Sequence, residues 1–371
     1  MKTKFTVIAI MSLIMAISSC KEKEAYLNGN ISFYDDFAGT DTLYGTKIEF
    51  ADDMQAGLMT VYDSIMLFWH PNYKDYNVLM CNINSGKNMG FLCRKGNGPE
   101  EFGEFAYSMQ FVVDNNGTKI WVDDMLKDKM SLLNLSESIK EGTTIIDSIV
   151  DKKGKEEFFN ISHTFMLDNN MMLVKNQSGG RISFGTDDSD TYDYLPEAYR
   201  IYKGQEKLKE FKLYNKSLIN PNYKSQSFSI LSTCDRIKPD KSKVAMSMEK
   251  LPQINILDIN TGVLSGFRKS NSIDYKDLTT LTQEEQKIYY TTGIEVDNHY
   301  IFAMYANKFI EDDSYYFTKE IHVFDWESKA VKRLIFEQEF YIMTLDSKNK
   351  KLYLINGREE VYCYDIAYLY K

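Results

Sequence analysis

Apolar and polar positions alternate along most of the chain in a unit that occurs six times. Each unit opens with an apolar run that ends in Asp, followed by a short polar turn and a second apolar run. The marker aspartates of the six units are Asp63, Asp114, Asp168, Asp240, Asp297 and Asp346. They recur roughly every 57 residues, and a repeat of this length without a helical period indicates an array of strands.

Each unit continues with a third alternating run and, in the first five units, with a fourth. The third runs include residues 77–81, 254–257 and 361–364, and turns rich in Asn, Asp, Gly and Ser separate the runs. Such turns between alternating runs are the signal of hairpins, so each unit is predicted to be a four-stranded antiparallel meander. Six meanders arranged radially predict an all-β fold, namely a six-bladed β-propeller over residues 31–371.

The sixth unit reaches Lys371 just after its third strand. Residues 31–34 and 42–50 are strand-like, but they precede the first unit. One of these segments is predicted to supply the missing outer strand of the last blade, because pairing the two ends of the chain closes the ring and removes open sheet edges.

Composition agrees with a large sheet core and argues against one class of partner. The 371 residues include 26 Tyr and 22 Phe but only 6 Pro, which favours strands. The formal net charge of −9 is the opposite of a nucleic-acid footprint, which needs clustered Lys and Arg. We therefore expect no nucleic-acid partner.

The first twenty residues have the pattern of a secretory signal. A basic start precedes an apolar run over residues 5–17, and Ser18, Ser19 and Cys20 follow. The run is too short and wrongly flanked for a spanning helix. Small residues before a Cys resemble the lipobox of bacterial lipoproteins, which implies that Cys20 is lipidated and becomes the mature N-terminus; plain secretion is the alternative. Residues 21–30 would then be a tether, and the acyl anchor predicts a place at the outer membrane or cell surface, with a periplasm-facing position as the other option.

Residues 94–105, RKGNGPEEFGEF, connect the first unit to the second. A phosphate-binding loop is not expected here, because Pro99 lacks an N–H and two carboxylates, Glu100 and Glu101, follow it. The stretch is better interpreted as a linker whose glycines permit a sharp crossing between blades, with Phe102 or Phe105 wedged between them.

The same stretch carries a family resemblance. After the glycine-rich linker come a strand ending in Asp114, then Gly117, then the strand 120–123 with the sequence IWVD. Over residues 94–135 this order resembles an NHL repeat, and the whole chain is similar to the six-bladed, TolB-like propeller lipoproteins of Gram-negative bacteria. The resemblance implies a propeller that binds a partner, but the partners of such propellers are diverse.

Loop lengths predict which end of the propeller is functional. Turns between first and second strands are short, whereas long segments occupy the connections at the other end: 70–76, 94–108, 176–198, 270–292 and 307–319. Candidate ligand-binding residues in or beside them are Trp69, His70, Tyr73, Arg94, Arg181, Tyr192 and Tyr316. Rigid aromatic rings beside polar groups would suit a glycan, a peptide or a protein partner, and the central channel would suit a small ligand. The alternative is that the rings only pack the loops onto the blades.

One helix is indicated among these loops. Thr282 and Glu285 have the spacing of a capping box, which predicts a short helix up to Tyr290. Such a helix would either cover the loop-rich face or fill a gap in it.

No catalytic motif is found. The four histidines stand in different units, and neither H-E-x-x-H nor G-x-S-x-G occurs. The cysteines after Cys20 lack the C-x-x-C spacing of a zinc site, so no metal or other cofactor is expected; Cys81 and Cys93 could form a disulfide or remain buried thiols. We expect a binding or scaffold module, not an enzyme. The alternatives are a glycan-processing enzyme with carboxylates at the channel mouth, or an envelope assembly factor.

Overall fold

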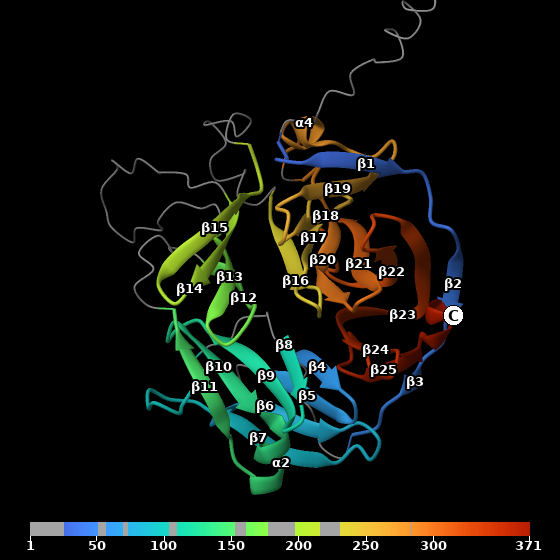
Figure 1. Cartoon of the computed structure of the whole chain (residues 1–371). Coiled ribbons are helices and arrows are strands. Elements are labelled where there is room, and N and C mark those ends of the chain that lie inside the picture. Colours follow the sequence, from blue (N-terminus) through green and yellow to red (C-terminus); the bar gives the residue numbers. More distant parts are fainter. Residues whose placement is uncertain are drawn as a thin grey trace, which may run out of the picture.

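The computed structural model describes residues 26–50, 57–69, 73–103, 110–152, 161–176, 197–215, 231–282 and 284–371. Residues 1–25, with the predicted signal and Cys20, lie outside this part of the chain. The fold is all-β and has a β-propeller arrangement, in which the sheets stand around one axis (Figure 1).

Three sheets are built from four consecutive strands each, as the repeat predicts. The first contains β4 (Leu58–Tyr62), β5 (Ile65–Trp69), β6 (Tyr76–Asn82) and β7 (Asn88–Arg94). The second contains β8 (Gln110–Asp114), β9 (Gly117–Asp124), β10 (Lys129–Asn134) and β11 (Ile146–Asp151). The third contains β12 (Ile161–Met166), β13 (Met171–Asn176), β14 (Ala198–Lys203) and β15 (Glu206–Lys212). All neighbouring strands in them are antiparallel, so each sheet is a meander.

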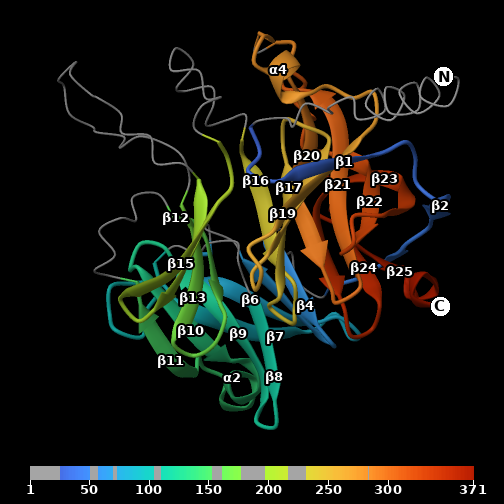
Figure 2. The same cartoon turned by 45° about the horizontal axis from the view of Figure 1, so that its top comes forward.

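The fourth sheet has a strand that the repeat does not contain. Its meander is β16 (Thr233–Ile237), β17 (Lys243–Met248), β18 (Gln253–Asp258) and β19 (Leu264–Lys269). The N-terminal strand β1 (Asn30–Tyr34) then pairs with β19 in parallel at the outer edge, as Figure 2 also shows.

The last sheet has eight strands, because one long strand takes part in two sets of pairs. Its members are β20 (Lys287–Val296), β21 (Tyr300–Phe309), β22 (Thr318–Asp325), β23 (Ala330–Asp346), β24 (Lys351–Asn356), β25 (Val361–Asp365), β3 (Thr46–Lys47) and β2 (Thr40–Leu43). The first part of β23 pairs mainly with β22, and its last part, from Phe340 to Asp346, pairs with β24. At the far edge β3 pairs antiparallel with β25, so the N-terminal segment does supply a strand beside the last strand of the chain.

The marker aspartates recur in the repeat because their side chains stabilise the turn that follows the first strand. In five of them a side-chain oxygen accepts a hydrogen bond from the backbone N–H two residues later: Asp114, Asp168, Asp240, Asp297 and Asp346. This contact fixes the tight turn between the first and second strands. Asp63 instead has a positive φ of 58° and forms an ion pair with Lys348 at 2.8 Å.

The N-terminal segment is a strap across the outer edges of several sheets. Leu27 forms a bridge to Tyr214 at the end of the third sheet, β1 lies on the fourth, and β2 and β3 lie on the eight-stranded sheet. Tyr26 and Leu27, which fall within the predicted tether, are only 2% and 4% exposed. The packed part of the chain therefore begins a few residues earlier than the repeat suggests.

The linker after β7 is structural. The Lys127 ammonium donates hydrogen bonds to the carbonyl oxygens of Gly98 and Glu101, at 2.9 and 2.7 Å, and Phe102 is fully buried. Gly96 has a φ of 154°, and a Cβ there would lie 2.0 Å from the Glu101 carboxylate, so the turn requires glycine. Phe105 lies outside the described residues.

Helices are few in the described part of the chain: α2 (Leu135–Glu141), α4 (Tyr275–Leu278) and the 3-10 helix η3 (Ala367–Tyr370). The prediction of a helix up to Tyr290 is wrong. Glu285 does accept hydrogen bonds from the backbone and hydroxyl of Thr282, but β20 begins at Lys287 because it pairs with β21. The described segment holds no helix long and apolar enough to cross a bilayer. Cys81 and Cys93 are both buried and are not joined by a disulfide.

Candidate functional site

A cavity of about 300 Å³ lies where the innermost strands converge. Residues of β4, β8, β12, β16, β20 and the last part of β23 all line it. These strands are the first strands of the six sequence units, so every unit contributes residues to the cavity lining. The cavity is at the lower end of the size range of small-molecule sites.

Aromatic and aliphatic side chains form most of the cavity wall. The aromatic members are Tyr62, Trp69, Phe111, Trp121, Phe165 and Tyr341. Gln110 also lines the wall, but its amide is engaged with the backbone of Met166 through both its oxygen and its nitrogen, at 2.5 and 3.3 Å. Gln110 therefore joins the second sheet to the third and is already satisfied.

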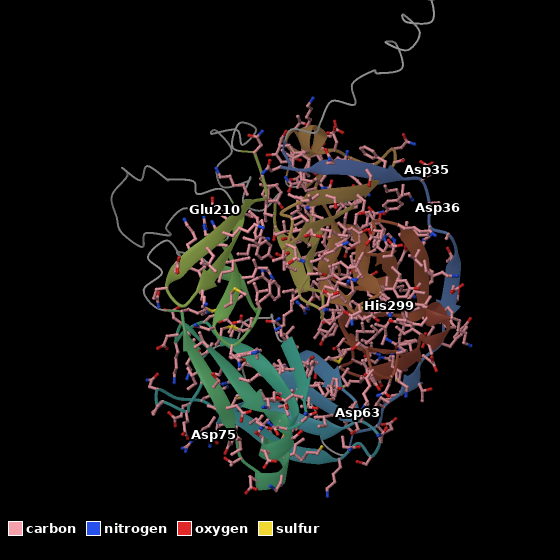
Figure 3. All side chains as sticks on the ribbon, viewed as in Figure 1. Asp35, Asp36, Asp63, Asp75, Glu210 and His299 are labelled. Carbon is pink, nitrogen blue, oxygen red and sulfur yellow. The ribbon has the colours of Figure 1, made fainter. Side chains whose placement is uncertain are left out.

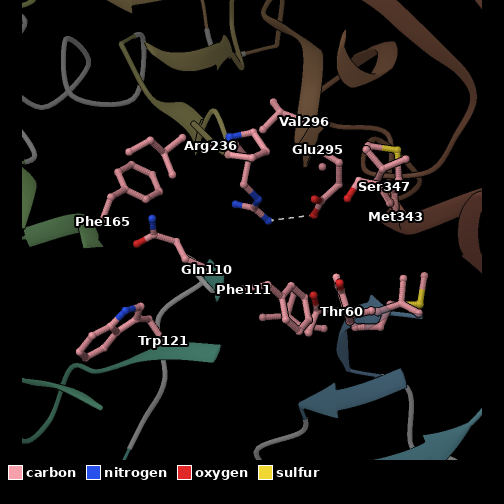
Figure 4. A pocket seen from close by; sticks show the side chains of 18 of the residues that line it. Thr60, Gln110, Phe111, Trp121, Phe165, Arg236, Glu295, Val296, Met343 and Ser347 are labelled. Atoms are coloured by element: carbon pink, nitrogen blue, oxygen red, sulfur yellow. Dashed lines mark hydrogen bonds and ion pairs between the residues drawn. The ribbon is translucent and has the colours of Figure 1, made fainter. Parts of the chain in front are cut away.

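The polar centre of the cavity is an ion pair between neighbouring sheets. Arg236, on β16, places its Nη2 atom 3.3 Å from Oε1 of Glu295 on β20 (Figure 4). Both side chains keep 19% of their surface exposed, so the pair is neither fully buried nor on the open surface. Burial raises the pKa of Glu295, and the neighbouring Arg236 opposes this shift.

Irregular pairing shapes the wall around this pair. Tyr290 pairs with Tyr305 and Ile294 with Ala303, so β20 carries extra residues between these two positions. Two of the extra residues, Thr292 and Gly293, line the cavity. The bulge thus brings backbone to the cavity next to Glu295.

Cations outnumber carboxylates in the described lining. Arg236, Lys238 and Lys241 are the cations, and Glu295 is the sole carboxylate among the described lining residues. Lys238 is engaged with Asp240 at 2.7 Å. Lys241 donates to the carbonyl of Leu167 at 2.7 Å, and burial lowers its pKa.

Three rings lead from the loop-rich end to the cavity. Tyr316 lies 4.8 Å from Phe317 between ring centroids, and Phe317 lies 5.2 Å from Tyr341, which lines the cavity. Tyr316 itself is 43% exposed. In an antiparallel meander the connection between the second and third strands lies at the end opposite the short turn with the marker aspartate, and the loop with Tyr316, between β21 and β22, is such a connection.

The predicted site residues do not form one group. Trp69 lines the cavity and is 4% exposed, and Tyr316 belongs to the aromatic chain just described. Tyr73 and Arg94 lie at the outer strand β7: the ring of Tyr73 contacts Phe91 of this strand at 5.7 Å, and Arg94 ends the strand with a side chain that is 70% exposed. His70, Arg181, Tyr192 and the lipidation residue Cys20 lie outside the described residues.

The acidic pair Asp35 and Asp36, one of the carboxylate pairs in the sequence, lies on the N-terminal strap at the periphery (Figure 3). It is not part of the cavity lining. The glycan-processing alternative needs two carboxylates that converge on one bond, and the described lining does not bring two together. No group of metal-ligating side chains is found within the described residues.

Sequence reasoning missed Arg236 and Glu295, although the repeat contains a signal for them. In the four residues before each marker aspartate, the charged side chains are Arg236, Lys238 and Glu295 alone. These positions belong to the first strand, which is innermost in a propeller. A charge there faces either a neighbouring blade or the channel.

A second polar cluster lies next to the cavity, but its carboxylate is fully buried and hydrogen-bonded by protein groups. Asp235 is fully buried, and its carboxylate accepts hydrogen bonds from Lys175 at 3.0 Å, Tyr199 at 2.5 Å and Thr233 at 2.6 Å. Burial alone would raise the pKa of Asp235, but Lys175 and these hydrogen bonds outweigh it and lower the pKa. The cluster joins the third sheet to the fourth and has the features of a structural contact.

Comparison with known proteins concerns the fold. No protein-family model matches the chain, and no curated protein matches it. A solved structure of a member of the DUF4221 family from Bacteroides vulgatus is similar, with a TM-score of 0.51 and 10% identity, over 88% of this chain and 96% of that one. A Bacteroides fragilis protein provisionally classed as exported has a TM-score of 0.48 and 15% identity, over 90% and 99% of the two chains. Raptor from Chaetomium thermophilum has a TM-score of 0.46 and 10% identity, over 87% and 29%.

The likeness to the Bacteroides vulgatus protein shows a shared fold, and fold alone does not define function. Together, fold and cavity define the class: an all-β protein of propeller arrangement with a ligand-sized cavity at its centre.

Proposed function

We propose that this protein is an exported binding module, a six-bladed β-propeller that takes a small ligand into its central cavity from the loop-rich end. The observation that carries the proposal is the cavity itself: an ion pair, Arg236 and Glu295, stands in a wall that is otherwise mostly apolar and aromatic. Ligand sites combine such a wall with a few fixed polar groups.

The count of six blades is supported by two observations. β23 pairs with β22 over its first part and with β24 over its last part, so the eight-stranded sheet can be divided into two meanders. The first strands of all six units also contribute to the same cavity lining. In the proposed ring, β3 is the outer strand of the last blade and joins the two ends of the chain.

Export and anchoring are supported by the N-terminal sequence. In the proposed mature form, the lipidated Cys20 is separated by residues 21–25 from the buried Tyr26. The stretch from Cys20 to Tyr26 can span at most about 22 Å, which keeps the propeller close to the bilayer. Cys20→Ala should release the protein from the membrane fraction of producing cells, whereas Cys363→Ala should not; equal membrane retention of the two variants contradicts lipid anchoring.

The proposal is one of binding and does not include hydrolysis. Glycoside hydrolysis uses a pair of carboxylates, whereas Glu295 is the one carboxylate in the described lining and is paired with Arg236. Larger partners such as a peptide or glycan chain would contact the loop-rich end first, where Tyr316 is exposed. The cavity would then hold one terminal group of the partner.

Binding in the cavity can be tested with the neutral apolar dye N-phenyl-1-naphthylamine, whose fluorescence rises in apolar sites. The protein lacking residues 1–20 keeps every described residue and is expected to bind the dye. Thr60→Phe places a ring into the cavity and should weaken binding at least about fivefold, since it removes space and adds no new partner. Thr40→Phe, on β2 at the outer edge, is the matched control and should leave binding unchanged.

Two outcomes contradict the proposed function. One is an absence of saturable dye binding by folded protein. The other is equal dye affinity of Thr60→Phe and Thr40→Phe, which would place the dye outside the cavity.

A further inference from the structure

The cavity has a charge opposite to that of the whole chain. The formal net charge of the protein is −9. The described lining of the cavity nevertheless carries three cations, Arg236, Lys238 and Lys241, against one carboxylate, Glu295. Lys238 is paired with Asp240 beside the lining, so Arg236 and Lys241 supply the positive excess. An excess of positive charge inside an acidic protein favours an anion in the cavity and repels a cation.

Arg236 has hydrogen-bonding capacity that the protein does not use. A guanidinium carries five N–H donors in a fixed plane. Within the described residues, Nη1 donates to the carbonyl of Asp235 at 3.1 Å and Nη2 donates to Glu295 at 3.3 Å. The remaining donors have no described acceptor, and the side chain extends into the cavity (Figure 4). Planar paired donors of this kind suit a carboxylate, sulfonate or phosphate group.

Glu295 positions Arg236 without neutralising all of it. The single contact at 3.3 Å is not the two-bond arrangement that fully satisfies an arginine–carboxylate pair. A carboxylate on one side holds the guanidinium in place, and a ligand can approach the other donors. Lys241 adds positive charge from the next turn, where one donor is engaged with Leu167.

The wall opposite the charge suits an apolar body. Phe111, Phe165 and Trp121 line the same cavity from the second and third sheets (Figure 4). Phe111 is partly exposed and can stack on a flat apolar group, whereas Phe165 and Trp121, only 1% and 2% exposed, add apolar surface around it. A molecule that filled the cavity of about 300 Å³ would therefore contact cations at one end and rings at the other.

Building on the proposed function, we propose that the ligand of this cavity is an organic anion, a small molecule or terminal group with an acidic head held by Arg236 and an apolar body packed against the aromatic wall. The acidic head is a carboxylate, a sulfonate or a phosphate monoester, which share the planar or tripod arrangement of oxygen acceptors that Arg236 can engage. No covalent step is involved.

The test compares two dyes that differ by one charged group. 8-Anilino-1-naphthalenesulfonate carries a sulfonate on the skeleton of N-phenyl-1-naphthylamine, so the pair isolates the effect of the anion. Arg236→Gln should weaken binding of the sulfonate dye at least about tenfold, the effect of a lost charge-assisted hydrogen bond, and should change binding of the neutral dye less than about twofold. Arg94→Gln removes an exposed arginine of the first sheet and should affect neither dye.

A second variant gives an effect of the opposite sign. Glu295→Gln removes the carboxylate but keeps Arg236, so the sulfonate dye should bind about threefold or more tightly while the neutral dye does not change. Because a damaged fold would weaken both dyes, tighter binding of one dye excludes that explanation. Displacement of the sulfonate dye by phenylacetate or by phenylphosphate, with benzyl alcohol as the neutral control, identifies the preferred acidic head.

The outcomes separate the two proposals. Binding of the neutral dye in the cavity without any effect of Arg236→Gln or Glu295→Gln on the sulfonate dye overturns the inference and leaves the binding module in place. Loss of both dyes to the same extent in Arg236→Gln also overturns it, because the arginine is then structural. Binding of neither dye by the folded wild-type protein removes the proposed function itself.

Discussion

Asp235 and Arg236 are consecutive residues of β16, and their side chains point to different neighbours. Asp235 faces the third sheet: Lys175 and Tyr199 of that sheet, and Thr233 of the same strand β16, donate to its carboxylate, and no surface remains exposed. Arg236 faces β20 and the cavity, with two described acceptors for five donors. The alternation of side chains along a strand thus places a saturated charge and an unsaturated charge side by side.

The difference indicates what each charge does. A buried charge that is surrounded by matched partners fixes how two sheets pack, and it has no capacity left for a ligand. A charge that is held by one carboxylate at the edge of a cavity keeps donors for a molecule from solution. We therefore assign packing to Asp235 and binding to Arg236, and three predictions test this division.

The largest effect is expected from Asp235→Asn. The substitution leaves Lys175, 2% exposed, with Glu197 at 3.6 Å as its nearest described acid. Loss of one partner of a buried pair should lower the free energy of unfolding by about 3 kcal/mol. Arg236→Gln, at a side chain that is 19% exposed, should lower the free energy of unfolding by about 1 kcal/mol. Urea denaturation of both variants measures the two values, and equal losses would remove the distinction between the two residues.

A smaller loss is expected at a second saturated cluster, in the sheet of β22 and β23. Burial would raise the pKa of Glu320, but the hydrogen bonds from His322 at 2.7 Å and from Arg333 at 2.5 and 3.0 Å outweigh it and lower the pKa to about 2. A carboxylate with a lowered pKa in the folded state stabilises the protein above its ordinary pKa near 4.5.

Glu320→Gln should therefore cost about 2 kcal/mol of unfolding free energy at pH 7. The difference from wild type should shrink as the pH falls from about 5 towards 2, because the wild-type carboxylate is then losing its charge. Denaturation curves over this pH range provide the measurement. A difference that stays constant across the range would show that Glu320 acts through packing and not through its charge.

The smallest effect is a pH dependence of ligand binding at the unsaturated site. Because the pKa of Glu295 is raised, this carboxylate takes up a proton at a higher pH than an ordinary glutamate and then releases Arg236 for an anion. The affinity for 8-anilino-1-naphthalenesulfonate should rise a few-fold from about pH 7 to pH 5. The other charged groups around the site are Arg236, Lys238, Lys241, Asp168 and Asp240. In Glu295→Gln the rise should be absent, and a rise that persists there would assign it to one of these other groups.

The meanders could be predicted from the sequence because their turns depend on local chemistry. The parts of the fold that depend on pairing between distant segments could not. The marker aspartates could be found in the sequence because their role, the hydrogen bond to the next turn residues, is local. β1 pairs in parallel with β19, and β2 pairs in parallel with β23. No short sequence pattern predicts that a distant segment adds a strand to a sheet. The same limit explains the failed helix: Thr282 and Glu285 make their local contact, but pairing of Lys287 with Phe309 decides the structure that follows.

The site was only partly predictable, for a related reason. Long loops and aromatic residues are visible in a sequence, and Trp69, which was predicted on that ground to bind a ligand, lines the cavity. Its role in binding stays a prediction. Whether a charge inside a strand is saturated depends on side chains from other sheets. Arg236 meets Glu295 from 59 positions further along the chain, and only the packed structure shows which donors are left over.

The proposed role of Arg236 is to hold an anionic group inside the cavity. A crystal structure of the protein lacking residues 1–20 with 8-anilino-1-naphthalenesulfonate tests it most directly. We expect sulfonate oxygens about 3 Å from nitrogen atoms of Arg236, with the rings of the dye against Phe111, Phe165 or Trp121. A dye bound on the outer edges of the sheets, or a sulfonate that points away from Arg236 into solvent, would contradict it.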